Sequence, residues 1–534
     1  MGRRVSLAQG RALGGSSAIN AQVFVPPSKT VIDAWESLGN PGWNWKTLEP
    51  YYSKIYSSEQ PEADLSDHFD TEQMAEGKGG LIQISNMVEA ENQIAKAWIE
   101  TFETLGHSPK GRPFSGELSG AFIPLATIDP VSKERSYSAS RYHTPIAGRN
   151  NLHVLTNSFV QKIVLEKDGP KIRATGVEFT SEGQTTTATA RREVILAAGS
   201  FQSPKMLELS GIGGDDLLQS HGIKVKIDNP AVGSNLQDHL VCGFSVEVQD
   251  HVDTIDDLVR QDAKAIEAAM GEYMTNRSGP FASVGVVSYA YIPVVAFLSE
   301  DEQSKFKSLL NANTPEKDSA PATKAYYDIA SSILLDKLDA SGALVAVQCQ
   351  GILPTDPARD DPPKEPISGK FVTLVAVMSQ PLSRGSVHIQ SSDASAKPAI
   401  DPKFLDHPLD LEVFARQMQS LEAIAEAEPF KSSILKEGGR RWDPRSDCKN
   451  LDNAKTLVKA SSISMWHPTS TCSMLPQEMG GVVDDKLIVY GTSNLRVVDA
   501  SVMPLIPRAN TQSSVYAVAE RGADIIKAAN RISM

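Results

Sequence analysis

The sequence predicts an α/β protein, α+β in its overall organisation, and two stretches far apart in the chain carry that prediction. Residues 193–211 run from a short apolar strand through Ala197-Ala198-Gly199 into a helix, which Gly211 is placed to end. This strand–glycine turn–helix layout is that of an α/β nucleotide-binding sheet, although α/β proteins that bind no nucleotide share it. Residues 495–498 form a second apolar run, which favours a buried strand ending at Asp499.

A change of sequence period after Asn510 predicts a helix near the end of the chain. Apolar residues and glycine follow one helical face there, at Val515, Val518, Ala519, Gly522, Ala523 and Ile526. Asn510 or Thr511 is the expected N-cap. The unpaired N–H groups and the positive dipole end of this helix would suit developing negative charge.

Residues 152–196 have the pattern of an antiparallel meander that returns to a main sheet. Strands are expected at Leu152–Leu155, Val160–Leu165, Ala174–Phe179 and Glu193–Leu196. Turn signals at Asp168-Gly169 and Glu182-Gly183 separate them. Ser203-Pro204 then predicts a helix start, with proline at the first helical position.

The remaining elements follow from periodicity and from proline and glycine. Helices are expected within Thr30–Tyr56, at Gln93–Leu105, around Thr254–Met270 and at Leu409–Ala427. Further strands are expected at Gly243–Val248, Ala343–Gln348, Phe371–Met378 and Ser386–Gln390. Glu59–Gly80 and the proline-rich Pro354–Pro366 are predicted surface loops, and limited proteolysis is expected to cut the second one first.

Composition excludes several classes of protein. The chain has 534 residues with 41% apolar content, enough for a large core and more than one domain. A net charge of −13 argues against a nucleic-acid surface, which needs clustered Lys and Arg. The longest apolar stretch, Val284–Leu298, is too short to span a bilayer. The four cysteines (Cys242, Cys349, Cys448 and Cys472) lack CxxC spacing, so neither a disulfide framework nor a metal site is predicted.

His467 is the strongest candidate for chemistry. Pro468 disfavours helix at the preceding residue, which places the imidazole on an irregular segment where it can project into a cleft. A single histidine among ten is more often structural than catalytic. Three other kinds of chemistry find no support in the sequence. The HExxH pattern of zinc hydrolases and the Walker A pattern of P-loop phosphoryl transfer are absent. Serine hydrolysis is disfavoured because Gly14-Gly15-Ser16-Ser17-Ala18 lacks the final glycine of a GxSxG elbow.

The Gly14-Gly15-Ser16-Ser17 stretch would let the backbone approach a ligand closely while offering N–H and hydroxyl donors. For these four residues alone, an ordinary Gly-Ser turn is the favoured interpretation.

Together, these blocks resemble the successive signatures of the glucose–methanol–choline (GMC) oxidoreductases, and most closely the fungal alcohol oxidases and dehydrogenases of that family. The matching blocks lie in the family order across nearly the whole chain: Gly10–Asn20, Ala197–Gly199 through Ser203-Pro204 and Ser210–Gly213, Asn235–His239, His467–Met474, Asn494–Pro504 and Pro507–Ala519.

The resemblance implies FAD-dependent oxidation of a small-molecule alcohol to a carbonyl by hydride transfer to the flavin. His467 matches the family's general base, and histidine suits this role because its ordinary pKa lies near neutrality. Asn510 matches the second catalytic position, where asparagine can hold the substrate oxygen but cannot replace the base.

The resemblance also implies a set of residues at the cofactor. The Gly14, Gly15, Ser16 and Ser17 loop and Asn20 would lie near the flavin and its pyrophosphate, and Val160 would touch the adenine end through its backbone. Asp499 and Ala500 would lie beside the flavin, and Thr511 and Gln512 at the helix start that points to it.

One departure from the family layout is evident. The chain contains no GxGxxG and begins where the block after that unit is expected, so the first βαβ unit of a Rossmann-like FAD domain is absent by comparison. The expected FAD-binding segments are 1–30, 140–240 and 455–534; residues 31–139 and 241–454 would bind substrate around an antiparallel sheet and cover the cofactor. A truncated or cofactor-free protein, inactive or repurposed for a cyclisation or elimination, is the alternative expectation.

Other properties stay open at this level. The resemblance favours a primary or secondary alcohol on a small or medium-sized organic molecule, including a secondary metabolite, over a sugar. Whether oxygen or another acceptor takes the electrons, whether the protein is secreted, and its oligomeric state are not indicated by the residues.

Overall fold

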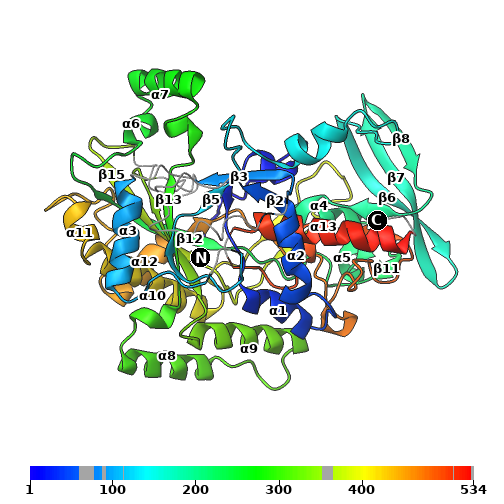
Figure 1. The fold of residues 1–534 in the computed structure, drawn as a ribbon. Coiled ribbons are helices and arrows are strands. Elements are labelled where there is room, and N and C mark those ends of the chain that lie inside the picture. Colours follow the sequence, from blue (N-terminus) through cyan, green and yellow to red (C-terminus); the bar gives the residue numbers. More distant parts are fainter. Residues whose placement is uncertain are drawn as a thin grey trace.

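Two lobes lie side by side in the computed structural model of the chain, which describes residues 1–58, 77, 79–86, 92–111, 114–351, 365–508 and 510–530 (Figure 1). One lobe contains a large antiparallel sheet flanked by helices. The other contains a three-stranded sheet and the C-terminal helix. The structure mixes helices with antiparallel and parallel strand pairs, which confirms the predicted α/β fold class.

The large sheet has six strands in the order β18-β12-β15-β14-β13-β4. Its strands are β4 (Gly120–Phe122), β12 (Leu240–Glu247), β13 (Val286–Ile292), β14 (Gly342–Val347), β15 (Phe371–Met378) and β18 (Ile463–Ser464). Every residue of β14 and β15 is buried, because helices and loops cover both faces of the sheet. The strands predicted in this region are therefore confirmed, with shifts of a few residues at their ends.

Helices pack on this sheet through aromatic and aliphatic side chains. They are α3 (Gln93–Thr104), α10 (Pro408–Ala425), α11 (Phe430–Ser433) and α12 (Leu451–Ser461), with α8 (Glu300–Ala312) and α9 (Pro321–Leu335) below them in Figure 1. Trp98, Phe414 and Leu457 join Leu374 of the sheet in one buried cluster. The predicted helices Gln93–Leu105 and Leu409–Ala427 are confirmed.

The single helix predicted around Thr254–Met270 is instead two, α6 (Asp256–Val259) and α7 (Ala263–Asn276). Gln261 adopts a φ of 60°, which breaks the helix between them. The Asp262 side chain then accepts hydrogen bonds from the backbone N–H groups of Lys264 and Ala265 and caps α7.

The second lobe carries an antiparallel meander of β6 (Ser158–Asp168), β7 (Lys171–Ser181) and β8 (Gln184–Thr189). Both predicted turns are confirmed: Gly169 and Gly183 have positive φ, as does Glu182. Strand β8 was not predicted, because its six residues are all exposed and carry no apolar alternation.

The strand predicted at Leu152–Leu155 is wrong. Leu152 closes a turn by donating its N–H to the Arg149 carbonyl, and the following residues find no strand partner among those that the structure describes. Val154 and Leu155 stay 44% and 66% exposed.

Two predicted strands, β9 (Val194–Leu196) and β19 (Leu495–Val497), pair in parallel with Leu495 beside Val194. Each leads to a helix or turn at the same edge, as parallel strands require. Helix α4 (Gly199–Leu209) follows β9, and α13 (Gln512–Ala529) ends the described chain. The predicted stop at Gly211 is confirmed by its φ of 92°, directly after the Ser210 C-cap.

Helix α4 begins at Gly199 and not, as predicted, at Ser203-Pro204, so Pro204 lies inside the helix. Proline has no N–H to give to the Ser200 carbonyl, and the Thr471 hydroxyl donates to that carbonyl instead at 2.7 Å. The Ser203 hydroxyl donates to Asp499 at 2.6 Å. Contacts with distant residues therefore decide where this helix begins.

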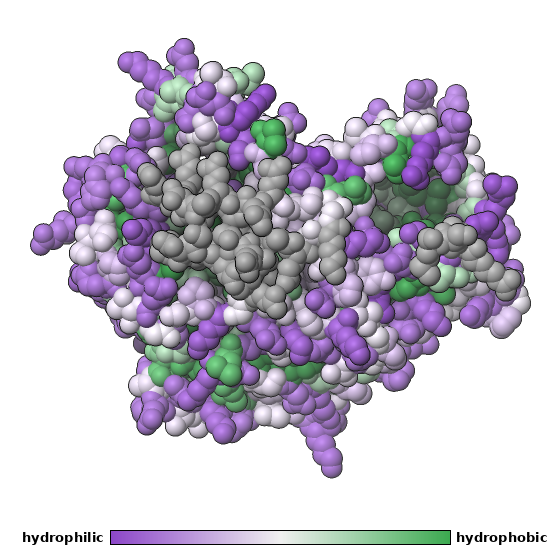
Figure 2. All heavy atoms as spheres, in the orientation of Figure 1, coloured by the Kyte–Doolittle hydropathy of each residue, from purple (hydrophilic) through white to green (hydrophobic). Residues whose placement is uncertain are grey.

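Strand β9 has one strand partner among the described residues, and the central Ile195 is 47% exposed. The lobe that carries it is hollowed in Figure 2, and apolar atoms line the hollow.

The remaining elements are short. They comprise β1 (Val23–Phe24), α1 (Lys29–Ser37), α2 (Trp45–Ile55), β2 (Tyr56–Ser58), β3 (Ile82–Asn86), β5 (Leu125–Ala126), β10 (Ile212–Gly213), α5 (Asp215–Ser220), β11 (Ile227–Asp228), β16 (Ser386–His388) and β17 (Ala399–Asp401). The helices predicted within Thr30–Tyr56 and the strand at Ser386–Gln390 are confirmed. The predicted loops Glu59–Gly80 and Pro354–Pro366 lie largely outside the described residues. Within the described part, no helix has the length and apolar character to cross a membrane.

Candidate active site

His467 lies on an irregular segment directly after β18, as predicted. Trp466 before it has a φ of 56°, which turns the chain, and the Asp238 carboxylate accepts the His467 backbone N–H at 2.8 Å. The imidazole Nε2 lies 3.5 Å from the Asn510 Nδ2. The two predicted catalytic residues, 43 positions apart in the sequence, are therefore neighbours in space.

A second histidine, His239, lies behind His467. Its Nδ1 is 3.0 Å from the Nδ1 of His467, and its Nε2 is 3.2 Å from the Ser379 carbonyl oxygen. Burial lowers the pKa of His239 to about 4. Burial, and then the adjacent His239, hold the pKa of His467 well below its ordinary value, so both rings are neutral at neutral pH.

The Asp238 side chain holds the segment that carries His467. Its carboxylate accepts the Ser464 hydroxyl at 2.5 Å as well as the His467 N–H. Burial raises the pKa of Asp238 to about 7, although its hydrogen bonds oppose that rise.

The side chain of Asn510 is oriented by the large sheet. The Tyr289 hydroxyl, from β13, donates to the Asn510 Oδ1 at 3.0 Å. With its oxygen occupied, the amide presents its Nδ2 donor towards His467. Burial raises the pKa of Tyr289, so the phenol stays protonated and keeps donating. Asn510 is thus set to donate a hydrogen bond to an oxygen beside Nε2.

Helix α13 starts next to this pair, as predicted. Thr511 is its N-cap and makes no side-chain capping bond to the first turn. Gln512 turns aside to contact Asn20: the Asn20 Nδ2 donates to its Oε1, and its own Nε2 donates to the Thr127 hydroxyl at 3.3 Å. The structure therefore brings Asn20, Thr511 and Gln512 together.

The predicted Gly-Ser loop has left-handed backbone at Gly14 (φ 94°) and Gly15 (φ 55°), followed by a turn of 3-10 helix, Gly15–Ala18. A Cβ on Gly14 would lie 2.9 Å from the Tyr137 ring. The Ser17 hydroxyl donates to the Gly14 carbonyl at 2.6 Å and lies 2.9 Å from the Ser138 hydroxyl. Glycine is required at position 14 because the backbone there is left-handed and because a Cβ would clash with the Tyr137 ring.

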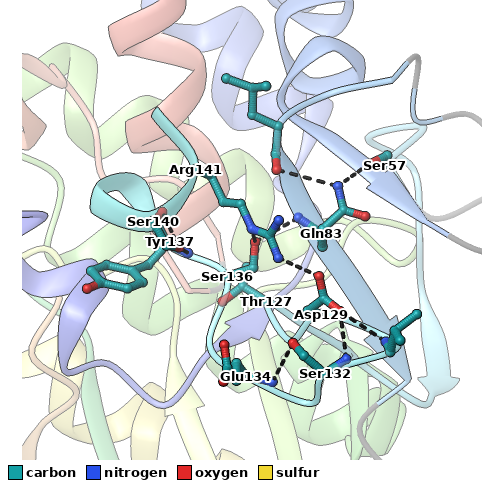
Figure 3. A network of polar contacts seen from close by, with 12 residues as sticks. Ser57, Gln83, Thr127, Asp129, Ser132, Glu134, Ser136, Tyr137, Ser140 and Arg141 are labelled. Atoms are coloured by element: carbon teal, nitrogen blue, oxygen red, sulfur yellow. Dashed lines mark hydrogen bonds and ion pairs between the residues drawn. The ribbon is translucent and has the colours of Figure 1, made fainter. Parts of the chain in front are cut away.

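A polar network holds the segment that carries Tyr137 and Ser138 (Figure 3). The Arg141 guanidinium donates to the Ser136 hydroxyl at 3.2 Å and pairs with Asp129 at 2.5 Å. The Gln83 N–H, from β3, donates to the same Ser136 hydroxyl at 2.8 Å. This network attaches the segment that packs against the Gly-Ser loop to strand β3.

Asp499 and Ala500 lie at the start of α4. The Asp499 carboxylate accepts from the Gly199 N–H at 2.9 Å, from the Ser203 hydroxyl, and from both the N–H and the hydroxyl of Ser501. The Ala500 carbonyl accepts from the Ser470 N–H at 3.2 Å. Because protein donors already occupy the carboxylate, Asp499 positions the surrounding backbone.

Val160 lies in β6, where it pairs with Phe179, in the outlying three-stranded sheet. The ladder between β6 and β7 shifts register between Val160 and Lys162. Such a bulge leaves backbone groups of the strand without ladder partners. Val160 therefore lies in a different sheet from Tyr289, which contacts Asn510.

Comparison with known proteins shows the family of the chain. Models of the family described as GMC oxidoreductase match residues 1–241 with their N-terminal part and residues 381–519 with their C-terminal part. The chain belongs to the GMC oxidoreductases. It is therefore an α/β flavoprotein of the oxidoreductase class, with fungal dehydrogenases and oxidases among its relatives.

Individual GMC oxidoreductases are similar over nearly the whole chain. A protein named dehydrogenase mpl7, from Monascus purpureus, is 34% identical over 97% of this chain and 83% of its own length. The GMC oxidoreductase family protein Mala s 12, from Malassezia sympodialis, is 31% identical over 98% of this chain and 80% of its own. The solved structure of a fungal aryl-alcohol oxidase superposes with a TM-score of 0.80 at 26% identity, covering 98% of this chain and 86% of that one.

Two residues whose side chains contact the side chains of His467 and Asn510 were not predicted as site residues. His239 belongs to the Asn235–His239 block, and the adjacent Asp-His was the available signal. Tyr289 lies inside the apolar run Val284–Leu298, where nothing in the sequence distinguishes it from a core tyrosine.

Proposed function

We propose that this GMC oxidoreductase oxidises a primary or secondary alcohol to a carbonyl, with FAD as cofactor and His467 as general base. The observation that supports this most is the His467–Asn510 pair beside the start of α13. Bound FAD would accept the hydride from the alcohol carbon and pass the electrons to oxygen or another acceptor.

The residues present fit a flavin at this place. The uncapped N–H groups of α13 and its positive dipole end would stabilise negative charge there. The Gly14–Ser17 loop has no room for a side chain at position 14, as expected where a backbone approaches a ligand closely. The interrupted ladder at Val160 would offer backbone groups to the adenine end.

His467 would take the proton of the alcohol hydroxyl at Nε2. The ring is neutral because its pKa lies well below the ordinary value, so the base is available over the neutral range. Positioned proton transfer of this kind typically accelerates a reaction by about 10²–10⁴-fold.

Asn510 would donate its Nδ2–H to the same alcohol oxygen. Tyr289 keeps the amide in the orientation that this requires. The pair then recognises a hydroxyl group by both of its atoms, since the hydrogen faces Nε2 and the oxygen faces Nδ2. A carbonyl product keeps only the bond to Asn510.

The experiment is anaerobic stopped-flow reduction of the purified protein by a panel of primary and secondary alcohols, including aryl alcohols, with sugars as the comparison. We expect a yellow protein whose flavin absorbance bleaches with at least one alcohol. A protein that holds FAD but is reduced by none of the alcohols would refute the proposed substrate class.

The same purification tests the alternative of a cofactor-free protein. A folded chain that stays colourless, takes up no FAD when it is added, and still depends on His467 for its biology would replace this proposal by a non-redox reaction such as a cyclisation or elimination. The observation that keeps this alternative in the test is that β9 has one strand partner among the described residues and that its Ile195 is 47% exposed.

A further inference from the structure

The imidazole of His239 is completely buried and takes no part in the proposed chemistry, yet it contacts the base directly. Residue 239 immediately precedes β12, and its backbone carbonyl accepts the Met465 N–H at 2.9 Å. The strand pairing of Leu240 with Ser464 therefore brings the His239 side chain against the segment of His467.

The hydrogen-bond partners of His239 determine which of its nitrogens carries the proton. Its Nε2 faces the Ser379 carbonyl oxygen at 3.2 Å. A carbonyl oxygen can only accept, so Nε2 must be protonated and donate. Because a neutral imidazole has one N–H, the Nδ1 of His239 then bears a lone pair.

The same reasoning carries one residue further, to His467. Its Nδ1 lies 3.0 Å from the Nδ1 of His239, which can only accept. The proton of His467 must therefore be on Nδ1, and its Nε2 must bear the lone pair. That Nε2 faces the donor amide of Asn510, whose oxygen is already occupied by Tyr289. All four hydrogen bonds point in one direction, from Tyr289 to Ser379.

We propose that His239 is a positioning residue that holds His467 in the Nδ1–H tautomer and so leaves Nε2 free to accept the proton of the substrate. The kinetic consequence rests on the proposed function, whereas the tautomer is a property of the chain itself. After proton transfer, the His467 Nδ1–H would still donate to His239, so the imidazolium keeps a partner inside the protein.

The charged and titratable neighbours do not provide this orientation. The Asp238 carboxylate contacts the backbone N–H of His467 and the Ser464 hydroxyl. Loss of the His239 acceptor would leave a buried Nδ1–H without a partner, which is unfavourable. The ring would then populate the Nε2–H tautomer, which blocks the proposed base.

The test is two-bond ¹⁵N–¹H correlation NMR of the purified full-length chain labelled at histidine, in which the two neutral tautomers give different patterns. The signals of His467 are those that disappear in His467→Asn. We expect the Nδ1–H pattern in the wild type. His239→Leu should add the Nε2–H pattern, and His239→Asn should keep the wild-type pattern because its Oδ1 can still accept.

A kinetic comparison uses the same variants. We expect His239→Leu to slow flavin reduction by alcohol by about 10–100-fold at unchanged FAD content, as for other partners that orient a functional histidine. His239→Asn should recover most of the wild-type rate, which a purely structural role would not explain.

The outcomes separate this inference from the proposed function. An Nε2–H pattern for His467 in the wild type overturns the inference, and so does a His239→Leu protein that keeps the Nδ1–H pattern alone. If His239→Leu does not fold, the wild-type spectrum still decides. A wild type that shows the Nδ1–H pattern but is not reduced by any alcohol would refute the proposed function and leave the tautomer assignment standing.

Discussion

At the residue scale, the proposed chemistry of His467 depends on the burial of its imidazole away from water. In solution its imidazole would be partly protonated near pH 6.5. Burial and the neighbouring His239 lower its pKa, which keeps the lone pair available. The proposed base is thus prepared by its surroundings before any substrate arrives.

Replacing His467 by alanine should therefore slow flavin reduction by roughly 10²-fold or more while FAD stays bound, because the change removes the proton acceptor and not the cofactor contacts. Stopped-flow reduction measured together with the flavin-to-protein ratio checks this. His251→Ala, at an exposed histidine, is the matched control. Joint loss of FAD and stability would instead mean that His467 has a packing role beneath Trp466 and Pro468.

The pH dependence of that step has a defined sign. A base with a lowered pKa stays unprotonated as the pH falls through 6.5, so the rate constant should stay level there and fall only at more acidic pH. An inflection near pH 7 that Asp238→Asn removes would belong to that carboxyl, whose pKa is about 7. An inflection near pH 6.5 that survives in Asp238→Asn would contradict the lowered pKa of His467.

Asn510→Ala should raise the barrier by on the order of 1–3 kcal/mol, since it deletes one hydrogen bond to the substrate oxygen. Tyr289→Phe should cost on the order of 1 kcal/mol, because it only frees the amide to rotate. A double-mutant cycle on the reduction rate is the measurement: Tyr289→Phe should have little further effect once Asn510 is alanine. Additive effects would show that Tyr289 acts independently of Asn510.

At the element scale, Asp499 joins the start of α4 to the segment after β19. Asp499→Asn replaces one acceptor oxygen by a donor, which would face either the Gly199 N–H and Ser203 hydroxyl or the Ser501 donors. We expect a loss of unfolding free energy on the order of 1–3 kcal/mol and a lower Tm. Asp216→Asn, at an exposed position in α5, should leave Tm unchanged. Equal Tm values for the two variants would refute the joining role.

At the scale of the whole molecule, the site lies where the two lobes meet. Tyr289 comes from the large sheet, whereas Asn510 lies just before the C-terminal helix α13 of the other lobe. The buried Arg508 pairs with Asp339 at 3.1 Å, and the Tyr326 hydroxyl donates to the Pro504 carbonyl at 2.7 Å. A ligand bound at this place would therefore stabilise both lobes.

Excess FAD should accordingly raise the Tm of the whole chain, by mass action worth about 2.7 kcal/mol at a hundred times Kd. Gly14→Ala should reduce that rise, because its Cβ would meet the Tyr137 ring and its φ of 94° disfavours alanine. Differential scanning calorimetry with and without FAD is the measurement. Gly148→Ala, at a position with open space for a Cβ, is the control. A Tm that does not change when FAD is added would favour the cofactor-free alternative.

The sequence by itself determined the order of the family blocks, the strand–helix units at β9–α4 and β19–α13, and the candidates His467 and Asn510. These depend on local periodicity, on glycine and proline, and on side-chain chemistry, all of which can be read along the chain. The prediction of the Leu152–Leu155 strand was wrong because a strand needs a partner, and strand pairing is not a local property. The start of α4 was misplaced because Thr471 and Asp499, both distant in sequence, satisfy its first turn.

Only the tertiary structure decided the state of the proposed catalytic groups. His239 and Tyr289 act through hydrogen bonds that span 228 and 221 residues, and such contacts leave no spacing to recognise. The tautomer of His467, the orientation of the Asn510 amide and the lowered pKa all arise from burial and from neighbours brought by other strands. Candidate site residues can therefore be predicted from the sequence. The positions of their protons, on which the proposed function depends, are set by the packing around them.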